Sequence, residues 1–148
     1  GFRQAVRENG LELREDWVSH LSSISFDMAL SEAMHVLSAP DAPDAYFAIS
    51  DVYAAAILKA ANKLGLSVPQ DVSIVGFDNI DISLMTDPAI TTMKQPSYQM
   101  GYQACEILID KIENPATETR QIFLERISYS FCDVRRPMGR RFFRKELF

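Results

Sequence analysis

Polar side chains that could recognise a small ligand stand just after two apolar runs of the chain. Ser50 and Asp51 directly follow the run 45–49, and Asp78 comes shortly after the run 72–75. Ligands of open α/β sheets bind outside the carboxyl ends of the parallel strands, so these are the first positions at which we look for a site. The carboxylate of Asp78 can accept hydrogen bonds from two adjacent hydroxyl groups, a geometry that suits sugars.

Both positions also have a purely structural interpretation, and it stays open at this stage. Asp51 can be no more than the N-cap of the helix that follows it. Asp78 and Asn79 can be no more than turn-forming residues, because Asp and Asn tolerate left-handed backbone and bond to their own main chain.

Signatures of catalysis are weak in this sequence. It has no Gly-x-Gly-x-x-Gly fingerprint, no phosphate-binding loop ending in Gly-Lys-Ser or Gly-Lys-Thr, and no Gly-x-Ser-x-Gly elbow. Asp78 and Asp81 lie in one loop, but no lysine or histidine follows the strands to tune these two carboxylates. We therefore expect a binding protein rather than an enzyme, with no cofactor. An enzyme that uses Asp78 or Asp51 as a base remains a disfavoured alternative.

The cysteines and histidines do not form a metal site. Cys105 and Cys132 are too few for a disulfide scaffold and too isolated for zinc, so we expect two buried thiols in a reducing compartment. His20 and His35 lie far from each other and from any cysteine pair, so a surface or structural role is favoured for both.

The net charge of −5 is unevenly distributed. Residues 135–148 hold six basic side chains and one acidic one, and the remainder of the chain is strongly acidic. An acidic body repels a phosphate backbone, which argues against a nucleic-acid interface there. The tail mixes Arg with Phe as single-strand binders do, but docking on its own acidic body is favoured. No apolar stretch is long enough for a membrane span, and the N-terminus lacks the pattern of a secretory signal.

The hydrophobic pattern alternates between helices and strands. The expected elements are a helix ending at Asn9, a helix over 25–37, a strand over 45–49, a helix capped at 50 or 51 and running to 64, strands over 72–75 and 90–93, a helix over 98–113, and strands over 121–124 and 127–132. The two strands over 45–49 and 72–75 flank a helix, so this β-α-β unit makes them parallel. The fold class is α/β with a doubly wound parallel sheet. A chain that opens in mid-helix is expected to be part of a longer protein.

Three stretches carry a resemblance to a known family. They are Pro43-Asp44-Ala45-Tyr46-Phe47-Ala48-Ile49-Ser50-Asp51, Gly65-Leu66-Ser67-Val68-Pro69-Gln70-Asp71-Val72-Ser73-Ile74-Val75-Gly76-Phe77-Asp78-Asn79, and Ile90-Thr91-Thr92-Met93-Lys94-Gln95-Pro96. Their order and spacing resemble the effector-binding domain of the lactose-repressor (LacI/GalR) family of bacterial transcription regulators. The resemblance extends from Gly1 to Ile127.

The resemblance implies a periplasmic-binding-protein-like fold in which an effector lies between two α/β lobes. Residues 1–94 would be most of the C-terminal lobe without its first strand, and 95–126 a fragment of the N-terminal lobe. Residues 127–134 would be a strand returning to the C-terminal lobe, followed by the basic tail 135–148. The DNA-binding headpiece of the family and its cleft arginine would precede this chain.

The resemblance also implies the residues that face the effector. Asp78 matches the cleft aspartate of the family, and Gln95 matches a cleft residue near the hinge. Ser50 stands beside Asp51 where the family usually has an asparagine. Ile24 falls where the family often has an aromatic ring that stacks on the effector.

By resemblance, the chain is the effector-binding and dimerisation region of a cytoplasmic LacI-type repressor. Its partners would be a sugar or purine-like effector, a second copy of the chain, and operator DNA reached only through the absent headpiece; no membrane is involved. The helix over 98–113 would lack a cover in its own lobe, so we expect self-association. With one lobe mostly missing, effector affinity is expected to be weak or lost. A fragment of a periplasmic-type sugar-binding protein for transport is the alternative.

Overall fold

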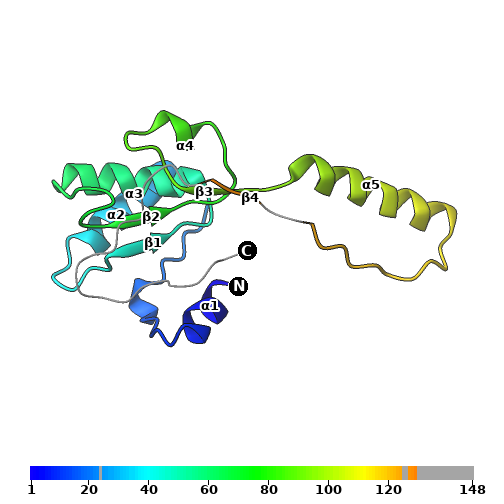
Figure 1. The fold of residues 1–148 in the computed structure, drawn as a ribbon, viewed down its shortest axis with the longest axis horizontal. Coiled ribbons are helices and arrows are strands. Elements are labelled where there is room, and N and C mark those ends of the chain that lie inside the picture. The colour runs from blue at the N-terminus through cyan, green and yellow to red at the C-terminus, as the bar shows by residue number, and fades with distance from the viewer. Residues whose placement is uncertain (24, 125–126, 130–148) are drawn as a thin grey trace.

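The computed structural model describes residues 1–23, 25–124 and 127–129 (Figure 1). In chain order the elements are α1 (Phe2–Glu8), a 3₁₀ helix (Glu15–Trp17), α2 (Phe26–Leu37), β1 (Ala45–Phe47), α3 (Asp51–Lys63), β2 (Ser73–Val75), α4 (Ile82–Met85), β3 (Thr92–Lys94), α5 (Ser97–Glu113) and β4 (Ile127–Tyr129).

The strands form two ladders, β1 with β2 and β3 with β4, and isolated bridges place the second ladder beside the first in the order β1, β2, β3, β4. β1 and β2 are parallel, with Tyr46 opposite Ile74, which confirms the predicted β-α-β unit around α3. Two further bridges, Val75 with Thr91 and Asp78 with Lys94, place β3 beside the carboxyl end of β2 in the same direction. β4 pairs with β3 in the antiparallel sense. The carboxyl ends of three parallel strands therefore meet at one edge.

Helices cover both faces of this sheet. Tyr46 and Ile74 pack on the side of α2 and α3, in two apolar clusters that contain the buried core. Phe47 points to the opposite face because side chains alternate along a strand, and its ring stacks on Phe2 of α1 at a centroid distance of 5.3 Å. The predicted doubly wound α/β fold is confirmed.

Small side chains set how closely α3 approaches its neighbours. Its core residues include five buried alanines, of which four are fully inaccessible and one, Ala55, is nearly so. These residues are Ala54, Ala55, Ala56, Ala60 and Ala61. Alanine has the highest helix propensity and loses no side-chain rotamer freedom on burial. The sequence of α3 thus favours both the helix and its tight packing against α2 and β2.

Local signals fix the helix ends as the sequence predicts. The Ser25 hydroxyl accepts a hydrogen bond from the Met28 amide at the start of α2. The Ser50 hydroxyl accepts one from the Val52 amide at the start of α3, at 3.3 Å. Gly65 follows α3 with a φ of +74°, a left-handed conformation in which glycine is not strained.

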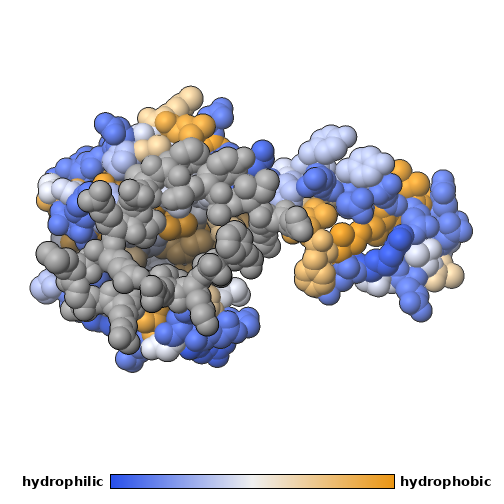
Figure 2. All heavy atoms as spheres, in the orientation of Figure 1, coloured by the Kyte–Doolittle hydropathy of each residue, from blue (hydrophilic) through white to orange (hydrophobic). Residues whose placement is uncertain are grey.

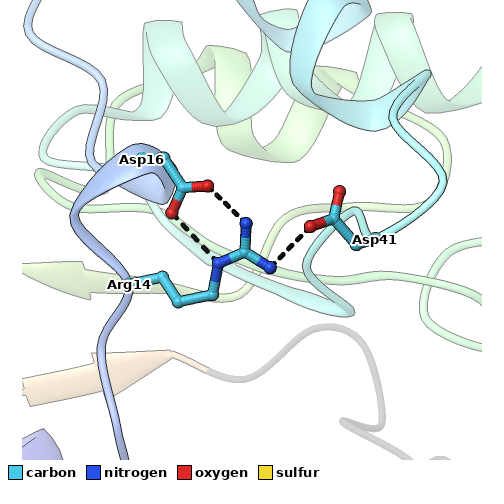
Figure 3. A network of polar contacts seen from close by, with 3 residues as sticks. All are labelled: Arg14, Asp16 and Asp41. Carbon is cyan, nitrogen blue, oxygen red and sulfur yellow. Dashed lines mark hydrogen bonds and ion pairs between the residues drawn. The ribbon is translucent and has the colours of Figure 1, made fainter.

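An arginine ties the segment after α1 to the loop after α2 (Figure 3). Arg14 donates from Nε to Asp16 at 3.0 Å, and its two terminal nitrogens bond Asp16 and Asp41. Its guanidinium also lies 4.6 Å from the centre of the Trp17 ring. The hydrogen bond from Arg14 lowers the pKa of the Asp16 carboxyl below its ordinary value of 3.8. These side chains are exposed, so the contact orients the segment more than it stabilises the fold.

Helix α5 stands apart from the α/β body and none of its residues is buried (Figure 1). Leu108, Ile109 and Ile112 are 54–69% exposed, and apolar atoms show along this projection in Figure 2. The prediction of a buried Cys105 is wrong, because that residue lies exposed on this helix. Cys132 lies outside the described residues.

The predicted strand over 121–124 is also wrong, since this stretch has no regular structure. Phe123 there is 85% exposed. A strand exists only when a neighbour accepts its hydrogen bonds, and none of the described strands pairs with this stretch. The predicted strand over 127–132 is confirmed for Ile127–Tyr129, and its remainder lies outside the described residues, as does the basic tail 135–148.

Candidate ligand-binding site

Asp78 and Gln95 come together at the carboxyl edge of the sheet. The Gln95 side-chain amide donates a hydrogen bond to Oδ1 of Asp78. The Asp78 amide donates to the Met93 carbonyl at 3.0 Å, which ties the segment after β2 to the end of β3. Among the described residues, the second oxygen of Asp78 accepts no hydrogen bond. Asp78 and Gln95 are both half-buried, so the pair offers an acceptor and an amide to a ligand at this edge.

The backbone at Asp78 adopts an unusual conformation. Its φ is +116°, and that of Asn79 is +57°. A left-handed backbone is tolerated by Asn but costs most other residues about 1–3 kcal/mol when the surroundings impose it. The turn-forming interpretation therefore describes Asn79 well. Asp78 is held in a strained conformation by its neighbours, a condition that clusters at functional sites.

Asp51 lies in the interior instead of at the surface of the edge. Its side chain is fully buried, and its two oxygens accept hydrogen bonds from different parts of the chain. Oδ2 accepts from the Ile80 amide at 2.9 Å, and Oδ1 accepts from the Thr92 hydroxyl at 2.5 Å. Asp51 is also not the N-cap of α3, because Ser50 makes the capping hydrogen bond.

The remaining predicted contacts are placed differently. Ser50 is 7% exposed, and its hydroxyl already accepts from the backbone of α3. Ile24 lies outside the described residues. The structure thus brings together Asp78 and Gln95 and buries Ser50 and Asp51. Contact of Ser50, Asp51 or Ile24 with an effector stays a prediction.

Two residues at this edge were missed by reasoning from the sequence alone. Thr92 is fully buried and links Asp51 to the Asn79 amide, which donates to its hydroxyl at 3.3 Å. Gly76 lies so close to Asp51 that an added Cβ would sit 2.3 Å from Oδ1. A threonine inside an apolar strand and a glycine at a strand end are the signals that could have drawn attention to them.

A cavity of about 390 Å³ lies away from this edge, along β1. Its walls include Trp17, Tyr46, Phe47 and Ile49, and none of Asp51, Asp78 or Gln95 contributes to it. Burial, and secondarily the charge of Glu32, raises the pKa of Tyr46 to about 12. The buried hydroxyl of Tyr46 has no hydrogen-bond partner among the residues that the structure describes. The cavity is mostly apolar, so we place the hydroxyl-binding groups at the Asp78 edge instead.

The described ranges offer neither a metal-binding cluster nor a membrane-spanning helix. No group of three or more His, Cys, Asp or Glu side chains there could hold a metal ion. No helix in that part of the chain has the length and apolar character needed to cross a membrane.

Comparisons with known proteins agree on one family. Residues 1–129 match the model of the periplasmic binding protein-like domain. The chain is 36% identical over 113 residues to the HTH-type transcriptional repressor CytR of Escherichia coli (strain K12), covering 76% of this chain and 33% of that protein. It is 32% identical over 120 residues to the repressor PurR of Vibrio vulnificus (strain CMCP6), covering 81% and 36%. The chain spans about a third of the length of these relatives.

Solved structures show the same likeness. A transcriptional regulator of the LacI type from Bacillus cereus subsp. cytotoxis has a TM-score of 0.80 at 28% identity, with 86% of this chain and 45% of that one covered. The transcriptional regulator CelR in complex with cellobiose has a TM-score of 0.77 at 30% identity, with 87% and 39% covered.

Proposed function

Because the chain belongs to the periplasmic binding protein-like domain family, among relatives that are LacI-type regulators, we propose that it is the effector-sensing part of a transcriptional repressor. The relatives named CytR and PurR are repressors, which supports regulation over transport and over catalysis. The repressor acts in the cytoplasm, where its operator DNA lies, and it reaches DNA through a headpiece outside this chain.

The observation that carries the proposal is the Asp78–Gln95 pair. One oxygen of Asp78 is engaged by the Gln95 amide, and the other accepts no hydrogen bond from the described residues. A carboxylate held this way accepts a hydrogen bond from a ligand hydroxyl or ring N–H, and the Gln95 carbonyl oxygen adds a second acceptor. A sugar or a purine-like molecule carries such donors. The solved neighbour CelR is named as a complex with cellobiose, which supports a sugar.

The mechanism is a shift between two arrangements of two lobes. We assign residues 1–94 and β4 to one lobe, and the segment between β3 and β4, which carries α5, to the other. Gln95 follows β3 directly and precedes α5, so it lies where the chain passes from one lobe to the next. An effector held by Asp78 in the first lobe and Gln95 at the crossing stabilises the closed arrangement by its differential affinity for it.

We further propose that the chain associates with a second copy through α5. Leu108, Ile109 and Ile112 share one side of this helix and are more than half exposed. An apolar strip of this kind on a regulator is typical of an interface.

The test is an NMR titration of the chain with cellobiose, ribose, hypoxanthine and cytidine, each up to millimolar concentration, because one lobe alone binds weakly. We expect chemical-shift changes for at least one compound at the amides of residues 78–80 and at the Gln95 side chain. Asp78→Ala should abolish them. Asp87→Ala, which removes an exposed carboxylate farther along the same segment, should preserve them. Absence of shifts with every compound, or shifts confined to the cavity along β1, would contradict the proposal.

A further inference from the structure

A fully buried carboxylate contacts the two segments that form the proposed binding edge. Asp51 is the first residue of α3, and its side chain is fully inaccessible. None of the ion pairs among the described residues involves it. Burying a carboxylate is costly unless hydrogen bonds replace its water. Here neutral donors do so, and the N-terminal position on a helix of 13 residues adds a favourable dipole.

The donors to this carboxylate come from the two segments that carry Asp78 and Gln95. Ile80 is two residues after Asp78, and its amide donates to Oδ2 of Asp51. Thr92 belongs to β3, which leads to Gln95, and its hydroxyl donates to Oδ1. The same hydroxyl oxygen accepts from the Asn79 amide at 3.3 Å. Asp51 therefore joins both halves of the binding edge to the start of α3.

These contacts fix the backbone on both sides of Asp78. The amides of Asn79 and Ile80 are both held, which orients the two peptide planes that follow Asp78. On the other side, the Asp51 carboxylate occupies the space that a Cβ on Gly76 would need. The unfavourable φ of +116° at Asp78 persists only while neighbours impose it. The Asp51 carboxylate and the Thr92 hydroxyl hold the segment after Asp78, and the Met93 carbonyl holds the amide of Asp78 itself.

We propose that Asp51 is a positioning residue of the effector site: it sets the backbone of residues 76–80 so that Asp78 presents its carboxylate to the ligand, and it does not touch the ligand itself. This inference rests on the proposed function for its link to an effector. Its structural part, the control of residues 78–80 by Asp51 and Thr92, stands without a ligand.

The primary test is amide hydrogen exchange of the chain, measured residue by residue by NMR. Thr92→Val keeps the size of the side chain but removes the donor to Asp51 and the acceptor for Asn79. A hydrogen bond to a charged group is worth about a tenfold to hundredfold change in an opening equilibrium. We expect the Asn79 amide, which loses its acceptor, to exchange about tenfold faster or more. The Ser73 amide in β2, which donates to the Asp44 carbonyl, should stay within about threefold. Thr92→Ser should restore slow exchange.

Asp51→Ala extends the test, and a matched control is available. Asp71 is an exposed carboxylate that accepts the Ser67 amide at 2.7 Å in a loop before β2. Asp71→Ala should leave the exchange of Ile80 unchanged, whereas Asp51→Ala should accelerate it. If Asp51→Ala does not fold, the Thr92 pair decides the question, since Thr92→Val removes only one hydroxyl.

The outcomes separate this inference from the proposed function. Slow Asn79 exchange in folded Thr92→Val, or slow Ile80 exchange in folded Asp51→Ala, would overturn the positioning role, whatever the chain binds. Fast exchange together with loss of the shifts that cellobiose, ribose, hypoxanthine or cytidine cause in the unmodified chain would support it in full. Fast exchange with unchanged ligand shifts would overturn the link from Asp51 to Asp78. Fast exchange in a chain that binds none of these compounds would support control of the backbone and count against the effector function alone.

Discussion

Replacing Gly76 with alanine should destabilise the chain, mainly through one contact of the added methyl group. The backbone of Gly76 is not left-handed, so alanine is not excluded by its φ. The added Cβ would instead meet Oδ1 of Asp51 at 2.3 Å and the Cβ of Ala54 at 3.2 Å. The first distance is impossible without movement, and the atom that must move is a buried carboxylate oxygen engaged with Thr92.

The magnitude follows from these contacts. Adding a methyl group to a packed interior costs about 1–3 kcal/mol. Displacing the carboxylate weakens a hydrogen bond to a charged group, worth about 1.5–3 kcal/mol. We expect Gly76→Ala to lower the free energy of unfolding by about 3–5 kcal/mol. With a urea dependence of about 1–3 kcal/mol per molar, the unfolding midpoint should fall by about 2 M.

A double-mutant cycle identifies the cause. In an Asp51→Ala background only the tight approach to Ala54 remains, so Gly76→Ala should cost about 1 kcal/mol there. Gly101→Ala is the control: no atom of the described part of the chain lies within 4 Å of a Cβ at Gly101, and alanine favours helix α5. Urea unfolding followed by circular dichroism gives each value. Equal costs of Gly76→Ala in both backgrounds, within about 0.5 kcal/mol, would refute the assignment of the clash to Asp51.

Three further predictions concern other parts of the chain. Ser25→Ala removes the cap of α2 and should cost about 1 kcal/mol in urea unfolding; a change below a few tenths would argue against this cap. The pKa of the Asp16 carboxyl is lowered in the folded chain, so the pairing of Asp16 with Arg14 stabilises the fold above pH 3.8, and this stabilisation is lost as the pH falls through the lowered pKa. Arg14→Ala should move the NMR titration of the Asp16 carboxyl back toward 3.8. An unchanged titration would disprove the pairing. Ile112→Asp should shift the chain toward the monomer in light scattering at high concentration, and a chain that is already monomeric before substitution would contradict self-association through α5.

Features that depend on neighbours in the sequence were predictable. The apolar period and the serine before it identified α2, and the run before Ser50 identified β1. Parallel pairing of β1 with β2 followed from the crossover rule. The resemblance to the LacI/GalR effector domain, carried by three short stretches, is confirmed by the family model and the relatives.

Features that depend on distant partners were not predictable. The stretch 121–124 has the composition of a strand, but pairing decides whether it becomes one. Asp51 looked equally like a cap or a ligand contact, and its actual partners are amide and hydroxyl groups 29 and 41 residues away. A pattern along the chain carries no information about such contacts. Asp78 was identifiable because its place after a parallel strand is itself a rule of topology.

The pairing of β3 with β4 has a consequence for how the body tolerates the projecting helix. Lys94 and Ile127 are direct partners in that ladder, so residues 95–126 leave and return through adjacent strands. This segment is therefore the loop of one long β-hairpin formed by β3 and β4. The entropy of closing a loop grows only with the logarithm of its length, by about 0.6 kcal/mol per doubling. A short turn between Lys94 and Ile127 would therefore allow β3 and β4 to pair about as well. A change in the position of α5 would not, by itself, break this pairing.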